Sequence, residues 1–200
     1  MRPRLSNYYL EMDLRNSLYG VIIQQFETLY DHPKLELSQK LLQKVLNNWV
    51  EEIKYDNYRI EILKSAIPFS WSLPGGSIYI SSELLNMCEY DSELEVIIAR
   101  EVAHVERRHL LQAYQKSQDD ATAIAIALTF VSLATQTDMS SVVEALGQFS
   151  YNLLGSGFDR KLEEEADALA MIYLIRNEDD KNSLLRILEK LKYRTNTRVG

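Results

Sequence analysis

The stretch from Val96 to His109, VIIAREVAHVERRH, limits the possible folds most strongly, because it is apolar around most of a helix yet carries polar side chains at its centre. A helix that is apolar on most sides is buried. Arg100, Glu101 and His104 would then lie in the core, where each polar group needs a partner. Arg100 and His104 share one helix face, and Glu101 is rotated by roughly 100° from Arg100. His109, about 140° around the helix from His104, is expected on a different face.

This R-E-x-x-H spacing differs by one residue from the H-E-x-x-H pattern, in which two histidines chelate zinc and the glutamate accepts a proton from zinc-bound water. Arginine cannot replace the first histidine as a ligand, because its guanidinium stays charged and has no lone pair to donate. The pattern alone has little specificity, since polar residues at this spacing most often lie on a solvated helix face. Whether this segment is a metallopeptidase-type helix or an ordinary solvated helix therefore has to be judged from its surroundings.

A second segment, DRKLEEEADALAM at residues 159–171, could supply partners for these polar groups. Glu163 and Asp167 are four residues apart and share one helix face, among apolar neighbours. We expect these two side chains to face inward, and Glu164 and Glu165 to be solvated. A fully solvated acidic helix is the alternative interpretation.

The composition restricts both partners and metal chemistry. A net charge of −7 and a pI near 5.1 argue against nucleic-acid binding, which needs a basic face. Cys88 is the only cysteine, so neither an internal disulfide nor a cysteine-based metal site can form. Any metal must be bound by carboxylates and by the histidines, which are His32, His104 and His109.

The local patterns of the first half predict helices followed by a small sheet. A helical pattern over 5–30 stops before Pro33, and a second helix follows that Ser38 could cap. The alternation in YRIEILKS (58–65) and the strand propensity after the Pro74–Gly76 turn predict strands. The sheet is expected to keep one exposed edge.

From Asp91 onward the patterns are helical. Ser92 and Glu95 could form a capping box for the helix that carries the opening stretch. Further helices are expected over 119–135, 140–154, 159–177 and 183–193. The fold class is therefore α+β and mainly α, in one domain over residues 1–200, with an N-terminal helical layer (1–55) ahead of a core (56–200).

The sequence predicts no membrane-spanning helix. The N-terminus lacks the apolar core of a signal peptide. The apolar run from Ala121 to Gln136 is shorter than the roughly 20 residues that span a bilayer, and it fits either a buried helix or one in contact with a membrane surface. For the compartment, the sequence leaves two alternatives open: the cytoplasm, or the cell envelope (periplasm) if a signal was removed.

Three segments in order resemble the gluzincin metallopeptidases of the CAAX prenyl protease and HtpX-like type. SLPGGSIYISSELL resembles the edge strand of that family, SELEVIIAREVAHVERRH its active-site helix, and RKLEEEADALA its glutamate-bearing helix. The resemblance covers roughly residues 58–191. It implies a zincin-like domain that hydrolyses peptide bonds with zinc.

Carried over residue by residue, the resemblance implies that His104 and Glu163 are zinc ligands and that Glu101 is the general base. Asp167 would orient His104 from outside the ligand set. The strand would bind an extended peptide or unfolded protein segment by adding it to the sheet. The residues implied for that strand are Gly76, Ser77, Ile78, Tyr79 and Ile80.

The sequence departs from the family at three places. Arg100 replaces the first ligand, Phe69 stands where members often have asparagine, and no histidine follows His109. Arg100 could form a bidentate pair with Glu163, which would neutralise that carboxylate and repel Zn²⁺. We therefore expect weak or absent zinc binding.

Three functions fit these observations. The first is a degenerate peptidase that keeps a peptide-binding groove. The second is an active zinc metalloendopeptidase, in which a carboxylate such as Asp159 or Asp167 completes the site or in which Arg100 is not the natural residue. The third is a helical interaction protein without peptidase ancestry, which would require the three ordered motifs to be coincidental and would be supported by a Glu163 far from His104.

Overall fold

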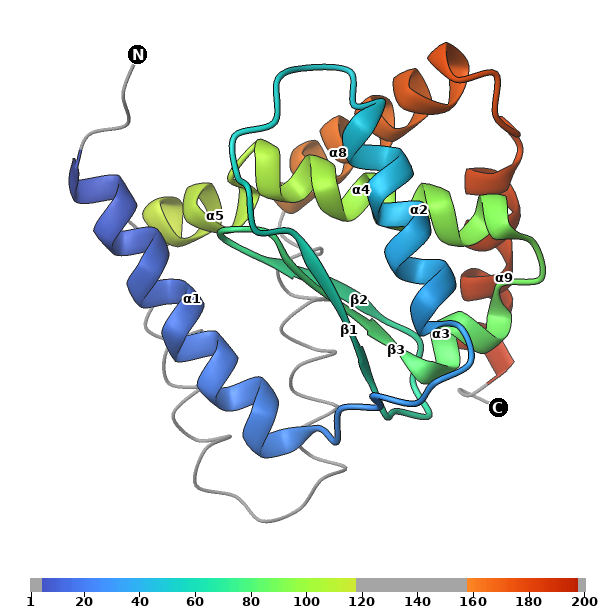
Figure 1. The fold of residues 1–200 in the computed structure, drawn as a ribbon, viewed down its shortest axis with the longest axis horizontal. Coiled ribbons are helices and arrows are strands. Elements are labelled where there is room, and N and C mark those ends of the chain that lie inside the picture. The colour runs from blue at the N-terminus through green and yellow to red at the C-terminus, as the bar shows by residue number, and fades with distance from the viewer. Residues whose placement is uncertain (1–4, 118–157, 198–200) are drawn as a thin grey trace.

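The computed structural model describes residues 5–117 and 158–197. This part of the chain is mainly helical with one small sheet, as the sequence predicts (Figure 1). Its helices are α1 (Leu5–Gln25), α2 (Leu35–Asn47), α3 (Ser82–Met87), α4 (Asp91–Glu106), α5 (His109–Ser117), α8 (Phe158–Arg176) and α9 (Ser183–Thr197), and its strands are β1 (Arg59–Leu63), β2 (Ser70–Leu73) and β3 (Ser77–Ser81). The helices expected over 119–135 and 140–154, and the apolar run within them, lie outside the described residues.

The strand β3 lies in the centre of the sheet, parallel to β1 and antiparallel to β2. Every residue from Ser77 to Ser81 is buried, and both sides of the strand are used for pairing. The expectation that Gly76–Ile80 forms an edge open to a peptide is therefore wrong. The outer side of β1 is also occupied, because Leu29 donates its backbone N–H to the carbonyl of Ile62 at 2.8 Å. The other edge of the sheet is β2.

Helices cover both faces of this sheet. Ile60, Ile62, Ile78 and Ile80 pack into the main core together with α2 and α4. The alternate residues, Leu63 and Tyr79 among them, form a second cluster with Ile22 of α1 and with Phe26. The expected N-terminal layer is therefore wrong in its arrangement, because α1 and α2 lie against opposite faces of the sheet.

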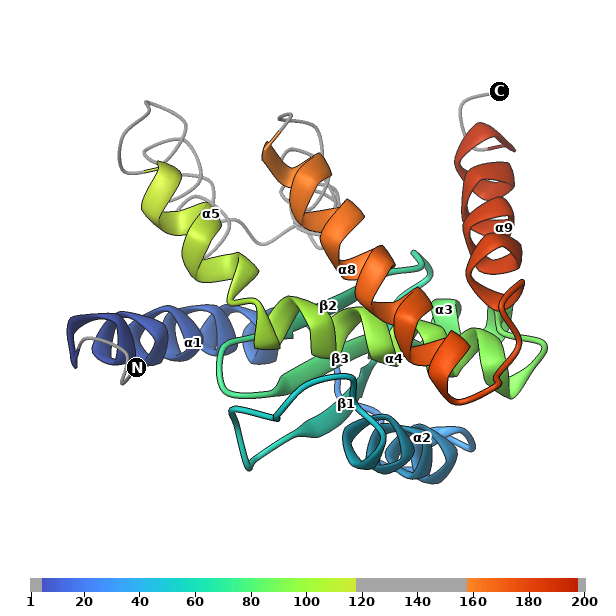
Figure 2. The same ribbon diagram turned by 90° about the horizontal axis from the view of Figure 1, so that it is seen from above.

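The helix α4 runs through the middle of the molecule, with the sheet and α2 on one side and α8 on the other (Figure 2). Its apolar residues are buried all around, as the sequence predicts. Ala103 on α4 and Ala166 on α8 are both fully buried in the same small cluster. Small side chains at this crossing let the two helix backbones approach closely.

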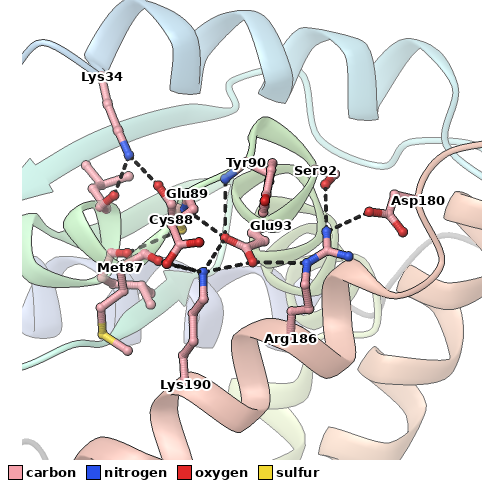
Figure 3. A network of polar contacts seen from close by, with 12 residues as sticks. Lys34, Met87, Cys88, Glu89, Tyr90, Ser92, Glu93, Asp180, Arg186 and Lys190 are labelled. Carbon is pink, nitrogen blue, oxygen red and sulfur yellow. Dashed lines mark hydrogen bonds and ion pairs between the residues drawn. The ribbon is translucent and has the colours of Figure 1, made fainter.

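The capping residues predicted for the helices α2 and α4 are wrong. Ser38 lies inside α2, where its hydroxyl donates to the carbonyl of Lys34 at 2.7 Å. At the start of α4, Glu93 rather than Glu95 accepts from the backbone N–H of Tyr90 (Figure 3). Glu95 instead accepts a hydrogen bond from the buried hydroxyl of Tyr173 at 2.6 Å.

The first helix also ends earlier than expected. Its last residue is Gln25 rather than Tyr30, because the chain then runs along β1 and Thr28 forms a bridge with Leu63. The helices α8 and α9 begin within one residue of the predicted starts. Among the described residues, no helix combines the length and the hydropathy that a bilayer crossing requires.

Candidate functional site

The crossing of α4 and α8 brings four polar side chains together. Arg100 and His104 are one turn apart on α4, and Glu163 and Asp167 are one turn apart on α8. The Nε2 atom of His104 lies 3.3 Å from Oε1 of Glu163. Glu163 and Asp167 thus face α4, and their side chains keep 28% and 33% of their surface exposed.

Arg100 holds both carboxylates of this site. Its Nη2 donates to Oε2 of Glu163 at 2.6 Å, and its Nε donates to Oδ1 of Asp167. The expected bidentate pair with Glu163 is therefore wrong, because the guanidinium divides its donors between two carboxylates. Burial acts to lower the pKa of Arg100, but the charges of Asp167 and Glu163 outweigh it and raise that pKa. Arg100 therefore remains a cation.

Two side chains, His104 and Arg100, lie against the carboxylate of Glu163. Burial acts to raise its pKa, whereas the hydrogen bond from His104 and the charge of Arg100 lower it. These contacts prevail, and the pKa of Glu163 lies below its ordinary value. Asp167 contacts Arg100 rather than His104, so it does not orient the histidine as the sequence analysis expected.

His109 is the second partner of His104, which the sequence analysis placed on a different face. The helix α4 ends at Glu106, and Arg108 has a left-handed backbone with φ of 56°. This turn brings Nδ1 of His109 to 2.9 Å from Nδ1 of His104, with the rings edge to face. The expectation assumed a continuous helix and is wrong. Burial, followed by the charge of His104, lowers the pKa of His109 to about 4.

Glu101 lies on the side of α4 that faces β2. Its Oε1 accepts a hydrogen bond from the hydroxyl of Ser70 at 2.7 Å, and the residue is buried. Ser70 was not expected at this site, because the sequence carries no local signal for its contact with Glu101. The ring of Phe69 stacks on that of Trp71, with 3.9 Å between ring centres. Phe69 also packs against the cluster that Ile22 of α1 forms with Phe26, Leu63 and Tyr79.

The donors at this crossing do not fit a zinc site. Zinc in a peptidase is bound by three protein side chains that can each donate a lone pair. His104 and Glu163 are such donors, but Arg100 is a cation that binds the second oxygen of Glu163. Within residues 5–117 and 158–197, no group of three or more histidine, cysteine, aspartate or glutamate side chains could hold a metal ion.

Comparison with known families decides the ancestry of this helix pair. Residues 36–196 match peptidase family M48. The chain belongs to this family. M48 peptidases are zinc-dependent, so the metallopeptidase resemblance is confirmed at the level of the family, and the interpretation as an unrelated helical protein is wrong. The narrower likeness to the CAAX prenyl protease and HtpX-like type stays a prediction.

Curated relatives carry peptidase names. The chain is 24% identical over 165 residues to the mitochondrial metalloendopeptidase OMA1 of Schizosaccharomyces pombe, covering 80% of this chain and 44% of that protein. It is 29% identical over 119 residues to the beta-barrel assembly-enhancing protease of Escherichia coli, covering 58% and 24%. For OMA1 of Arabidopsis thaliana the identity is 27% over 135 residues, covering 68% and 26%. The chain spans less than half of each of these three M48 relatives.

Proposed function

We propose that this chain is an M48 metalloendopeptidase relative in which a salt-bridged arginine has replaced zinc, and which binds extended peptides without hydrolysing them. The observation that carries the proposal is the position of Arg100, whose guanidinium contacts both Glu163 and Asp167. A fixed cation there neutralises the acidic residues and repels a divalent metal. By the family resemblance, His104 and Glu163 would be the two zinc ligands that remain.

Glu101 would not act as a general base in such a protein. The family resemblance makes it the general base, which requires a water molecule acidified by a metal. Without a complete ligand set, that water would not be activated. The hydroxyl of Ser70 holds the Glu101 carboxylate at 2.7 Å, so the side chain keeps a defined position beside β2.

The edge strand β2 is our candidate for the peptide-binding element. The backbone N–H of Ser81 donates to the carbonyl of Phe69, and every second residue of an antiparallel strand faces its partner. Ser70 and Ser72 therefore direct their backbone groups to the outer side. In the described part of the chain no strand pairs there. An extended peptide could add to this edge next to Glu101.

Bound zinc per chain tests the first half of the proposal. The protein would be purified without chelator or metal-binding tag and analysed by elemental mass spectrometry. We expect a ratio near zero for the natural chain and a ratio near one for Arg100→His, which completes the H-E-x-x-H pattern. A ratio near one in the natural chain would overturn the proposal.

Peptide binding tests the second half. Fluorescence anisotropy would report binding of a labelled unstructured peptide with alternating apolar and polar residues. Ser72→Pro removes an outward N–H and should weaken binding at least tenfold, whereas Ser72→Ala keeps the backbone donor and should bind like the natural chain. Equal affinities of these two variants would exclude β2 as the binding edge.

The alternative function is an active zinc metalloendopeptidase, which the names of the relatives favour. It requires another ligand, such as Asp159 or Asp167, beside His104 and Glu163. Asp167 contacts Arg100 in this structure, so it would first have to leave that ion pair. Zinc at one per chain together with cleavage of an unfolded protein would establish this alternative.

A further inference from the structure

We propose that His109 is a positioning residue that fixes the orientation of the His104 ring. The two Nδ1 atoms lie 2.9 Å apart, and the opposite nitrogen of His104, Nε2, lies 3.3 Å from Glu163. An imidazole rotates as a rigid unit about its bond to Cβ. Contacts at both of its nitrogens therefore define the direction in which His104 presents Nε2 to the site.

His109 is itself firmly held. It is only 3% exposed, and its Nε2 lies 3.4 Å from Oε2 of Glu165. Glu165 in turn forms an ion pair with Arg107, whose Nε lies 2.9 Å from Oε1 of that carboxylate. Glu165 is exposed, as expected, and it connects α8 to His109.

The backbone turn before His109 is anchored from a distant part of the chain. Arg108, in its left-handed conformation, lies with Nε 3.0 Å from Oε1 of Glu11 and donates to the hydroxyl of Tyr55 at 3.1 Å. The Glu11 side chain is only 6% exposed, so α1 contributes a buried carboxylate to this anchor. The contact between the two histidines thus depends on α1 and on the loop before β1.

Two substitutions of His109 test the contacts of its two ring nitrogens separately. Asparagine carries a polar atom on Cγ, where histidine has Nδ1, so His109→Asn can keep the contact with His104 while losing the contact with Glu165. Glutamine places its polar atoms one bond further out, near Nε2, so His109→Gln should keep Glu165 and lose His104. Both variants have a similar polarity, which makes them a matched pair.

Nuclear magnetic resonance of the chain labelled with ¹⁵N histidine provides the test, since the protein has only three histidines. In the natural chain we expect a ¹⁵N–¹⁵N coupling through the hydrogen bond between His104 and His109. His109→Asn should leave a ring N–H of His104 protected from exchange with water, and His109→Gln should expose it. His32, whose Nδ1 accepts from the backbone of Lys34, is the internal control for folding.

Absence of the coupling in the natural chain would overturn the proposal, as would identical His104 signals in the two variants. If a variant fails to fold, the coupling in the natural chain still decides. The proposal relies on the proposed function only for the view that His104 belongs to the functional site. Its readout requires neither zinc nor a peptide, so it can fail while the zinc ratio and peptide affinity come out as expected.

Discussion

The guanidinium of Arg100 lies between two carboxylates that would otherwise repel each other at the crossing of α4 and α8. Replacing it by methionine keeps the length of the side chain but leaves Glu163 and Asp167 without their cation. Breaking a buried ion pair costs several kcal/mol, and we reduce this to about 1–3 kcal/mol because both carboxylates are partly exposed. Urea unfolding at pH 7 should show this loss of stability for Arg100→Met.

The control for this prediction neutralises the carboxylates as well. Adding Glu163→Gln and Asp167→Asn to Arg100→Met should recover at least half of the lost stability, because no unpaired charge then remains at the crossing. A single variant as stable as the natural chain would show that the ion pairs contribute nothing to the fold.

The contact between Arg100 and Glu163 could be predicted from the sequence, because each of them lies in an apolar helical segment that carries a second polar residue one turn away. The contact between His104 and His109 could not be predicted. It depends on a left-handed residue at Arg108, and arginine gives no local signal for that conformation, unlike glycine or asparagine. Ser70 was missed because its contact with Glu101 depends on how β2 packs against α4.

At the scale of the element, the turn between β2 and β3 depends on its glycines. Gly75 and Gly76 have φ of 85° and 95°, where other residues are strained. A Cβ at Gly76 would lie 3.1 Å from Cα of Tyr58, whereas one at Gly75 would meet only the flexible side chain of Arg15 at 3.5 Å. Gly76→Ala should therefore cost about 2–4 kcal/mol and Gly75→Ala about 1–2 kcal/mol.

Thermal and urea unfolding of the two alanine variants would test this order. Equal losses would mean that the contact with Tyr58 adds nothing to the backbone strain. The turn itself was predicted from Pro74 and the glycines, but the central place of β3 was not. Strand order depends on which faces the distant helices α1 and α2 cover, and a run such as Ile78–Ile80 does not contain that information.

The turn at Arg108 offers a second test of an element boundary. Both Arg108→Gly and Arg108→Ala remove the ion pair with Glu11, so the difference between them reports the backbone alone. Glycine adopts the left-handed region without steric cost, and the glycine variant should be more stable than the alanine variant by about 1 kcal/mol. Chemical denaturation of the two proteins side by side measures this difference. An alanine variant of equal stability would mean that the turn relaxes when its anchor is lost.

At the scale of the whole molecule, a buried carboxylate joins the start of α4 to α9. Glu93 has a fully buried side chain and accepts from Lys190 at 3.0 Å through each of its oxygens (Figure 3). Arg186 adds a contact at 3.2 Å, and the backbone N–H of Glu89 donates at 2.8 Å. Since α4 also carries Arg100 and His104, this cluster fixes the C-terminal helix to the element that bears the candidate site.

These contacts make the stability of the protein depend on pH in a defined direction. Burial acts to raise the pKa of Glu93, but the hydrogen bond from Lys190 and those from the backbone outweigh it, so its folded pKa lies below the ordinary value. A carboxyl group with a lowered folded pKa stabilises the fold fully above its unfolded pKa, about 4.3, and this stabilisation is lost as the pH falls through the folded value. Acid should therefore weaken the attachment of α9.

Glu93→Gln tests this dependence, because glutamine keeps the shape of the side chain and cannot ionise. At pH 7 the variant should be less stable than the natural chain by about 1–3 kcal/mol, since hydrogen bonds to a charged group are lost. Between about pH 5 and pH 3 the difference should shrink, because the natural carboxylate becomes protonated while the amide is unchanged. Urea unfolding at several pH values measures both curves. A constant difference over this range would show that packing, rather than the charge of Glu93, holds α9 against α4.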